Sequence, residues 1–438
     1  MAKTKNRISG ISVYGFKSLR DEQRVTIRPL TVLAGANSSG KSSLMQPLLL
    51  LKQTLEAAGD PGALLLDGTN VKFTRADQLL AKGNKDEFGV RIELLDGQSL
   101  GLTFRKAERG FDLKEMDYVS QEESFSVVPS MSHDAIRTIL PEPWKTMHRE
   151  VGKDKKSALR WTVRRERCFF SFELTAPDDT SHRIRFGPFA LSPSRAFVSF
   201  IGEIIHLPGL RGNPRRTYQK AAGGPVYQGT FEPYVASVIA EWQGGVGGKN
   251  KLNELAHYLE AMTLTWKVKA EPVDDTQVEL KVGRLPRARQ GGAHDLVNIA
   301  DVGFGVSQSL PVLVALLAAR PGQLVYLEQP EIHLHPLAQR RLAGVLQTAV
   351  KRGVVTVVET HSAIFLRELQ TLIAIGNLNK EDVAMHWFAR NEEGETTITT
   401  AELDDKGAYG KWPEDFDDTE LQAEQAYLDA VETKEARQ

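Results

Sequence analysis

Hydrophobic and polar positions alternate along the chain in a pattern that is clearest after residue 299. There, short apolar runs are separated by longer segments with apolar residues at helical spacing, which predicts buried strands and packed helices. The predicted helices cover residues 309–318, 335–351 and 363–372, and the predicted strands cover residues 323–327 and 354–359. Short apolar strands that alternate with amphipathic helices are typical of a parallel sheet covered by helices. The pattern therefore predicts an α/β fold.

The first hundred residues read mainly as strands. Predicted strands cover residues 8–14, 24–28 and 30–34, and a long apolar stretch predicts a helix over residues 44–55. Asp96 and Gly97 lie between two further strand-like segments and predict a hairpin turn. Residues 106–200 mix polar and basic segments with strand-like pieces, and this change of pattern predicts an inserted subdomain.

The composition is that of a globular protein and excludes several other classes. The chain has 438 residues, of which 41% are hydrophobic, so it can bury a sizeable core. Its net charge of -1 excludes a uniformly basic nucleic-acid-binding protein. Cys168 is the one cysteine, which excludes a disulfide scaffold and an all-cysteine zinc site. We find no apolar signal core and no run near the roughly 18 apolar residues of a membrane span, and we expect a cytoplasmic protein without membrane contact.

Charge is balanced over the whole chain but segregated along it. Residues 141–220 carry 16 basic and 8 acidic side chains, whereas residues 402–435 carry 3 basic and 12 acidic ones. Such segregation favours a polar partner or two surfaces of this protein that face each other, and solvated faces are an equal alternative. The basic segments 211–220 and 281–289 could follow a phosphate backbone, so contact with DNA stays open.

The strongest motif lies between the predicted strand 30–34 and the helix after it. Residues 35–43 read Gly-Ala-Asn-Ser-Ser-Gly-Lys-Ser-Ser and contain the full G-x-x-x-x-G-K-[ST] phosphate loop. Gly35 and Gly40 allow the backbone N–H groups to point inward around a phosphate, and the helix N-terminus adds partial positive charge. Lys41 can reach the β- and γ-phosphates, and the Ser42 hydroxyl can bind Mg²⁺. The motif predicts nucleotide binding.

Polar side chains follow two predicted strands in the second half. Glu328, Gln329 and Glu331 come at the end of one apolar strand, and His361 follows the next. In open α/β sheets, ligands bind at the carboxyl ends of the strands, so these residues are candidates to hold Mg²⁺ or activate water. His361 could contact the γ-phosphate or orient the attacking water.

A fourth motif precedes the predicted helix 309–318. Gly303, Gly305 and Ser307 form a glycine-containing segment that could bind an anion at a second helix N-terminus. Because the chain already has one phosphate loop, this segment could act on a nucleotide held by another copy.

The order of these motifs, with Gly-Phe-Lys-Ser at residues 15–18, resembles ABC-type ATPases of the SMC/RecF/OLD (overcoming lysogenization defect) group. The resemblance covers residues 1–105 and 295–400. Residues 411–416 look like the C-terminal domain of small bacterial ATPases of this group, several of them in anti-phage defence loci. The resemblance implies an ABC-type ATPase head, with a mixed sheet that has a parallel core and flanking helices, and an inserted α+β subdomain.

The resemblance also implies a head-to-tail dimer, or a larger homo-oligomer, with two ATP molecules between protomers. One protomer would hold ATP through Gly35, Asn37, Ser38, Ser39, Gly40, Lys41, Ser42 and Ser43, and the other would contact it through Gly303, Gly305 and Ser307. Ser42 and Glu328 would hold Mg²⁺, and His361 would act as the switch histidine. The expected regions are an N-terminal lobe at 1–105, an inserted basic subdomain at 106–230, a C-terminal lobe at 231–400 and an acidic tail at 401–438.

Gln329 departs from the pattern of this group. The group usually has an acid at this position, and a glutamine cannot act as a base. We therefore expect slow hydrolysis and a long-lived ATP-bound dimer, unless Glu331 or His361 compensates.

We see no toprim nuclease motif after His361. If the ATPase controls a nuclease, we therefore expect that nuclease to be another polypeptide. The expected role is the ATPase sensor or scaffold of an anti-phage system that controls a separate effector such as a nuclease. A DNA-repair ATPase that acts directly on DNA and a catalytically inert ATP-dependent scaffold remain alternatives.

Overall fold

The computed structural model describes residues 6–83, 86–140, 160–176, 179–185, 194–221, 224, 226–287 and 295–410. The acidic tail expected at 401–438 lies outside the described residues from residue 411 onward, and so does part of the expected basic subdomain. In the described part of the chain, no helix is long and apolar enough to cross a membrane.

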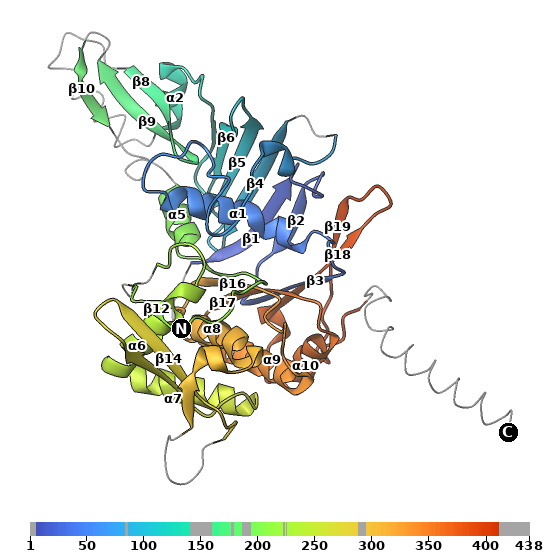
Figure 1. Ribbon diagram of the computed structural model, residues 1–438. Coiled ribbons are helices and arrows are strands. Elements are labelled where there is room, and N and C mark those ends of the chain that lie inside the picture. Colours follow the sequence, from blue (N-terminus) through green and yellow to red (C-terminus); the bar gives the residue numbers. More distant parts are fainter. Residues whose placement is uncertain are drawn as a thin grey trace.

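The centre of the molecule is a six-stranded sheet with a parallel core (Figure 1). In spatial order its strands are β11 (Ile205–Leu207), β16 (Leu324–Glu328), β17 (Val355–Thr360), β3 (Leu30–Gly35), β18 (Val383–Arg390) and β19 (Thr396–Thr400). All neighbours are parallel except β18 and β19. Every residue of β3 and β17 is buried, as expected for strands covered on both faces. This sheet confirms the predicted α/β class with a parallel core.

Helices and a second sheet cover the two faces of the central sheet. The helices on one face pack with Val32 and Leu327 in one core, and they are α6 (Val235–Gly244), α8 (Phe304–Ala318), α9 (Pro336–Lys351) and α10 (Ala363–Ala374). Helix α1 (Lys41–Glu56) lies on the other face, where Leu33 and Tyr326 join a second core. Alternate residues of β3 thus point into different cores, as the two-residue period of a strand requires.

The second sheet is antiparallel and packs over α1 (Figure 1). In spatial order its strands are β2 (Gln23–Thr26), β1 (Ile8–Tyr14), β4 (Glu87–Leu94), β5 (Ser99–Lys106), β6 (Phe111–Val119) and β7 (Ser124–Val127). β4 and β5 form the predicted hairpin around Asp96 and Gly97. The sheet continues past residue 105 into β6 and β7.

Two smaller units lie at opposite ends of the molecule (Figure 1). One is a three-stranded sheet with a helix packed on it: β8 (Arg160–Glu166), β9 (Phe169–Ala176), β10 (Asp179–Arg185) and α2 (His133–Ile139). Helix α5 (Ser194–Gly202), which follows this unit in the chain, packs against α1. The other contains β12 (Tyr218–Gln219), β13 (Val268–Pro272), β14 (Gln277–Gly283), β15 (Leu296–Asn298), α6 and α7 (Gly248–Ala261). Strand β11 returns from the first unit to the edge of the central sheet, where it pairs with β16.

Candidate functional site

The phosphate loop connects β3 directly to α1. Gly35 and Gly40 adopt φ angles of 144° and 104°, which side chains with a Cβ rarely allow. A Cβ on Gly35 would lie 2.2 Å from the Phe388 carbonyl oxygen, and one on Gly40 would lie 2.2 Å from Oγ1 of Thr396. Thr396 also donates from its hydroxyl to the Ser39 carbonyl at 2.7 Å, so β19 supports the loop from outside. Both glycines are therefore required by this close packing.

The amino group of Lys41 lies inside the loop. Nζ donates to the carbonyl oxygens of Gly35 at 2.9 Å and Ala36 at 2.8 Å. Burial lowers the pKa of Lys41 to about 8, and the nearby carboxylates of Glu359 and Glu331 oppose this shift. A cation in so little solvent interacts strongly with an anion placed on the loop.

Two carboxylates end adjacent strands beside the loop. Glu328 and Glu359 are register partners at the ends of β16 and β17. Ser42 donates from Oγ to Oε2 of Glu359 at 2.8 Å, and the buried Tyr326 hydroxyl donates to Oε1 of the same carboxylate. Burial and repulsion from Glu328 raise the pKa of Glu359 to about 7. Glu359 thus contacts the hydroxyl that the motif assigns to Mg²⁺.

The Glu328 carboxylate, the register partner of Glu359, has hydrogen-bond partners of its own. Its Oε1 is 3.0 Å from Nε2 of His206, and its Oε2 accepts from the Gly209 N–H at 3.2 Å. The side chain predicted to hold Mg²⁺ together with Ser42 is therefore oriented by β11 and the loop after it, whereas Glu359 contacts Ser42 directly.

The donor set fits a magnesium ion. Mg²⁺ prefers oxygen ligands and is usually held by one or two carboxylates together with phosphate oxygens and water. A hydroxyl and two carboxylates lie beside the phosphate loop, and they come from Ser42, Glu328 and Glu359. Among the described residues, no group of three or more His, Cys, Asp and Glu could hold a metal ion alone, so the phosphates would have to complete the shell.

Gln329 follows β16 in a strained conformation. Its φ angle is 43°, in the left-handed region that a non-glycine residue rarely adopts. Its N–H donates to the Glu359 carbonyl at 2.9 Å, and its own carbonyl accepts from Nη2 of Arg211 at 3.0 Å. These two bonds fix the backbone from both sides and hold Gln329 beside the two carboxylates.

Glu331 connects the segment after β16 to the segment after β17. Its Oε1 accepts from the Thr360 hydroxyl at 2.6 Å and from the His361 N–H at 2.9 Å. Its other oxygen is buried and has no hydrogen-bond partner among the described residues. Glu331 therefore orients the backbone that carries His361. Partial burial and the Lys41 charge lower the pKa of His361, which favours a neutral ring.

The start of α8 opens to the surface. Gly303 is the N-cap, a Cβ added to it would meet no atom within 4 Å, and the next residue, Phe304, is 54% exposed. The Ser307 hydroxyl donates to the Phe304 carbonyl at 3.1 Å. None of the hydrogen bonds recorded for the described residues joins Gly303, Gly305 or Ser307 to the phosphate loop. The fourth motif instead adjoins the segment after β16, where the Phe304 and His333 rings lie 5.9 Å apart between centroids.

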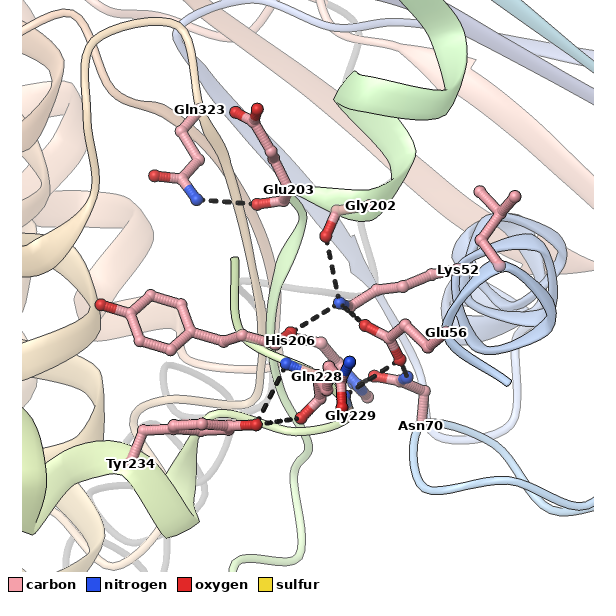
Figure 2. Close-up of polar contacts among 12 residues, drawn as sticks. Lys52, Glu56, Asn70, Gly202, Glu203, His206, Gln228, Gly229, Tyr234 and Gln323 are labelled. Carbon is pink, nitrogen blue, oxygen red and sulfur yellow. Dashed lines mark hydrogen bonds and ion pairs between the residues drawn. The ribbon is translucent and has the colours of Figure 1, made fainter. Parts of the chain in front are cut away.

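A buried polar network extends from Glu328 to α1. Figure 2 shows the part of it that contains His206, Asn70, Glu56 and Lys52. His206 bridges Glu328 and Asn70, whose Oδ1 is 3.1 Å from Nδ1 of the ring. Asn70 reaches Glu56 at 3.5 Å, and Glu56 forms an ion pair with the fully buried Lys52. Lys52 also donates to the Tyr227 carbonyl at 2.8 Å. Hydrogen bonds and an ion pair therefore connect the C-terminal turn of α1 to the Glu328 carboxylate.

Sequence reasoning missed Glu359, His206 and Tyr326 as site residues, and it considered Arg211 only as a residue that could reach the nucleotide across a dimer. In the structure Arg211 donates to the Gln329 carbonyl of its own chain. The sequence does carry one signal for Glu359, which is an acid at the end of a second apolar strand. Sequence reasoning overlooked it because the functional role in that motif was assigned to His361, two residues later. His206 and Arg211 come from a segment more than 110 residues before β16, and the pattern of the chain gives no sign of their approach.

Charge removal at Glu359 tests which carboxylate holds the metal. Glu359→Gln keeps the size of the side chain and removes its charge, so we expect Mn²⁺, used as a spectroscopic probe in place of Mg²⁺, to bind the ATP-loaded protein at least about tenfold more weakly. Electron paramagnetic resonance of free Mn²⁺ measures this affinity, and Glu328→Gln is the matched variant. An unchanged affinity in Glu359→Gln, with the whole loss in Glu328→Gln, would contradict the assignment.

Comparisons with known proteins agree with this geometry. Residues 30–125 and 281–367 match the sequence profile of a family described as "AAA domain, putative AbiEii toxin, Type IV TA system". No curated protein sequence matches the chain significantly.

Three solved structures are similar to the chain at low sequence identity. One is the SmcHead bound to the C-winged helix domain of ScpA, with 12% identity and a TM-score of 0.47, covering 91% of this chain and 98% of that one. The SMC head domain from Thermotoga maritima has 10% identity, a TM-score of 0.38 and coverages of 91% and 100%. An Smc head domain with an extended coiled coil, bound to the C-terminal domain of ScpA derived from Pyrococcus furiosus, has 11% identity, a TM-score of 0.44 and coverages of 91% and 97%.

The two segments that match the family contain the phosphate loop, both strand-end carboxylates, His361 and the start of α8. The match supports the predicted resemblance to ATPases, because residues 30–125 and 281–367 are similar to an AAA domain.

Proposed function

We propose that the chain binds ATP and Mg²⁺ in the phosphate loop, dimerises head to tail around ATP and hydrolyses it slowly. The observation that carries the proposal is the contact of Ser42 with Glu359 beside the buried Lys41. It is combined with the start of α8, where Phe304 is exposed and could meet a second copy. The γ-phosphate of a nucleotide bound to one copy would be contacted by the N-terminus of α8 in a second copy.

Each residue of the site has a part in this scheme. The loop N–H groups and Lys41 bind the phosphates, and Ser42, Glu359 and Glu328 hold Mg²⁺, which neutralises charge on the phosphates when bound. His361 contacts the γ-phosphate, and Glu331 fixes its position through the backbone. Gln329 can orient a water by hydrogen bonding but cannot accept its proton, so ATP persists between the protomers.

A long-lived ATP dimer suits a switch better than a motor. We propose that the dimer controls a separate effector in a defence system, and the family description, which includes a toxin of a toxin–antitoxin system, supports this assignment. Arg165 and Arg167 of the expected basic subdomain are engaged within the chain, with Asp60 and with the last carbonyls of α1. These internal contacts leave Arg165 and Arg167 less available to bind DNA.

Mixing two inactive variants tests the head-to-tail arrangement. Lys41→Ala removes the phosphate ligand and leaves α8 intact, whereas Ser307→Arg blocks the α8 start and leaves the loop intact. Each variant alone is expected to be inactive, and a mixture is expected to regain part of the ATP turnover, because one composite site of the mixed dimer is complete. Phosphate release measures the recovery. The pair Lys41→Ala and Gly40→Ala, both defective in the loop, is the control and recovers nothing.

An alternative outcome would reject the arrangement. If Ser307→Arg alone keeps the turnover of the unchanged protein, the α8 start takes no part in the site, and the nucleotide is bound and hydrolysed within one chain.

A further inference from the structure

Four side chains on three adjacent strands form one cluster at the start of α1. Tyr326 and Glu328 are two residues apart on β16, so their side chains share one face of the central sheet. His206 of β11 is the register partner of Tyr326. Glu359 of β17 is the register partner of Glu328, and it accepts a hydrogen bond from Ser42 of α1. The cluster therefore contains two rings and both carboxylates of the proposed magnesium site.

Each ring holds one oxygen of one carboxylate. The Tyr326 hydroxyl donates to Oε1 of Glu359, and Nε2 of His206 lies 3.0 Å from Oε1 of Glu328. Tyr326 is fully buried and His206 is 1% exposed, so little water competes for either bond. The second oxygen of each carboxylate, Oε2, hydrogen-bonds to other groups. One oxygen of each carboxylate is therefore held by a ring, and the other is not.

The two rings also hold each other in place. The His206 and Tyr326 rings are stacked, with their centroids 5.3 Å apart and their planes within 12°. Nδ1 of His206 is 3.1 Å from Oδ1 of Asn70, so the ring is hydrogen-bonded at both of its nitrogens. Stacking and two hydrogen bonds together fix the orientation of the imidazole. The positions of the two carboxylates are therefore set by one packed unit.

This arrangement has a consequence for the ion that the carboxylates hold. Ca²⁺ takes about six to eight oxygen ligands and often binds both oxygens of one carboxylate, whereas Mg²⁺ requires near-octahedral geometry and keeps several waters. To present both oxygens to an ion, a carboxylate must turn its plane toward that ion, and the buried bond from a ring opposes this rotation. Carboxylates that offer one oxygen each suit Mg²⁺ better than Ca²⁺.

We propose that His206 and Tyr326 are positioning residues that set the metal specificity of the site, favouring Mg²⁺ over Ca²⁺. They act through the orientation of Glu328 and Glu359. This inference rests on the proposed function, because it requires that the two carboxylates hold the ion of a bound nucleotide. Loss of the hydrogen bond from either ring frees a carboxylate to rotate, and Ca²⁺ gains more from that freedom than Mg²⁺ does.

Competition between Ca²⁺ and Mn²⁺ for the nucleotide-loaded full chain tests the specificity. Mn²⁺ replaces Mg²⁺ as the probe, a non-hydrolysable ATP analogue replaces ATP, and an excess of protein keeps the analogue bound. Electron paramagnetic resonance of free Mn²⁺ gives both dissociation constants, and the Ca²⁺ constant divided by the Mn²⁺ constant is the specificity ratio. We expect a higher ratio than for the free analogue, and a ratio at least about fivefold lower in Tyr326→Phe and in His206→Phe.

Two variants are the controls. His206→Gln restores a side-chain amide that can donate to Glu328, so it is expected to keep most of the ratio that His206→Phe loses. Tyr14→Phe removes a tyrosine hydroxyl whose partner is Thr103 of the second sheet, at 2.9 Å, and it is expected to keep the full ratio. A merely structural role of the rings would weaken the binding of both ions together and leave the ratio unchanged.

The outcomes separate this inference from the proposed function. Tight Mn²⁺ binding with an unchanged ratio in both ring variants would overturn the inference alone, and so would an equal fall of the ratio in Tyr14→Phe. Metal constants equal to those of the free analogue, unchanged in Glu359→Gln, would reject the proposed magnesium site itself. Tyr326→Phe keeps the ring and its stacking, so it decides alone if His206→Phe fails to fold.

Discussion

Lys41→Ala is expected to lower the affinity for ATP by about a hundredfold or more. Hydrogen bonds to a charged group contribute about 1.5–3 kcal/mol each, and in the bound state the Lys41 amine would donate to more than one phosphate oxygen. Its burial inside the loop strengthens these contacts further, since little water screens them. Equilibrium titration with a fluorescent ATP analogue measures the loss.

Lys17→Ala is the matched control for this variant. Lys17 is a half-buried lysine in the turn between β1 and β2 that donates to Gln46 of α1, and it is not one of the loop residues 35–43. It is expected to leave ATP binding within about twofold, a change well under 1 kcal/mol. If Lys41→Ala binds ATP as well as Lys17→Ala does, residues 35–43 do not form the nucleotide site.

Gln329→Glu is expected to raise the rate of ATP turnover at least about tenfold, since a positioned general base contributes about 10²–10⁴. The two backbone bonds that hold residue 329 do not involve its side chain, so the carboxylate of the variant takes the place of the amide. Steady-state phosphate release at saturating ATP measures the change, and Gln121→Glu, at an exposed turn between β6 and β7, controls for added charge.

The opposite result would assign the chemistry to another group. If the unchanged protein hydrolyses ATP rapidly and Gln329→Glu changes nothing, then Gln329 is not the water-orienting residue. Glu331 is the next candidate, because one of its carboxylate oxygens is buried without a partner among the described residues.

The local parts of the fold could be predicted from the sequence. The two apolar runs after residue 299 predict strands within one residue of β16 and β17, and the phosphate-loop motif predicts the connection from β3 to α1. Both signals are local, since strand period and turn glycines act within a few residues. The arrangement of these strands in a mixed sheet with a parallel core was predicted from the resemblance to the ABC-type group.

The partners of the carboxylates could not be predicted in this way. The contact of Ser42 with Glu359 depends on the placement of β17 between β16 and β3, which pairs residues more than 300 positions apart. Lys52 and Glu56 illustrate the same limit, because an i,i+4 pair on a helix normally indicates an exposed surface. Here the lysine is fully buried, and segments far along the chain cover it.

The molecular mass in solution tests most directly whether ATP holds two copies together. Light scattering on the full chain is carried out without nucleotide, with ADP and Mg²⁺, and with ATP and Mg²⁺. We expect one chain in the first two conditions, twice that mass with ATP, and the mass of one chain again for Ser307→Arg with ATP. A mass that is the same in all conditions, while ATP is bound, would contradict the ATP-held head-to-tail dimer.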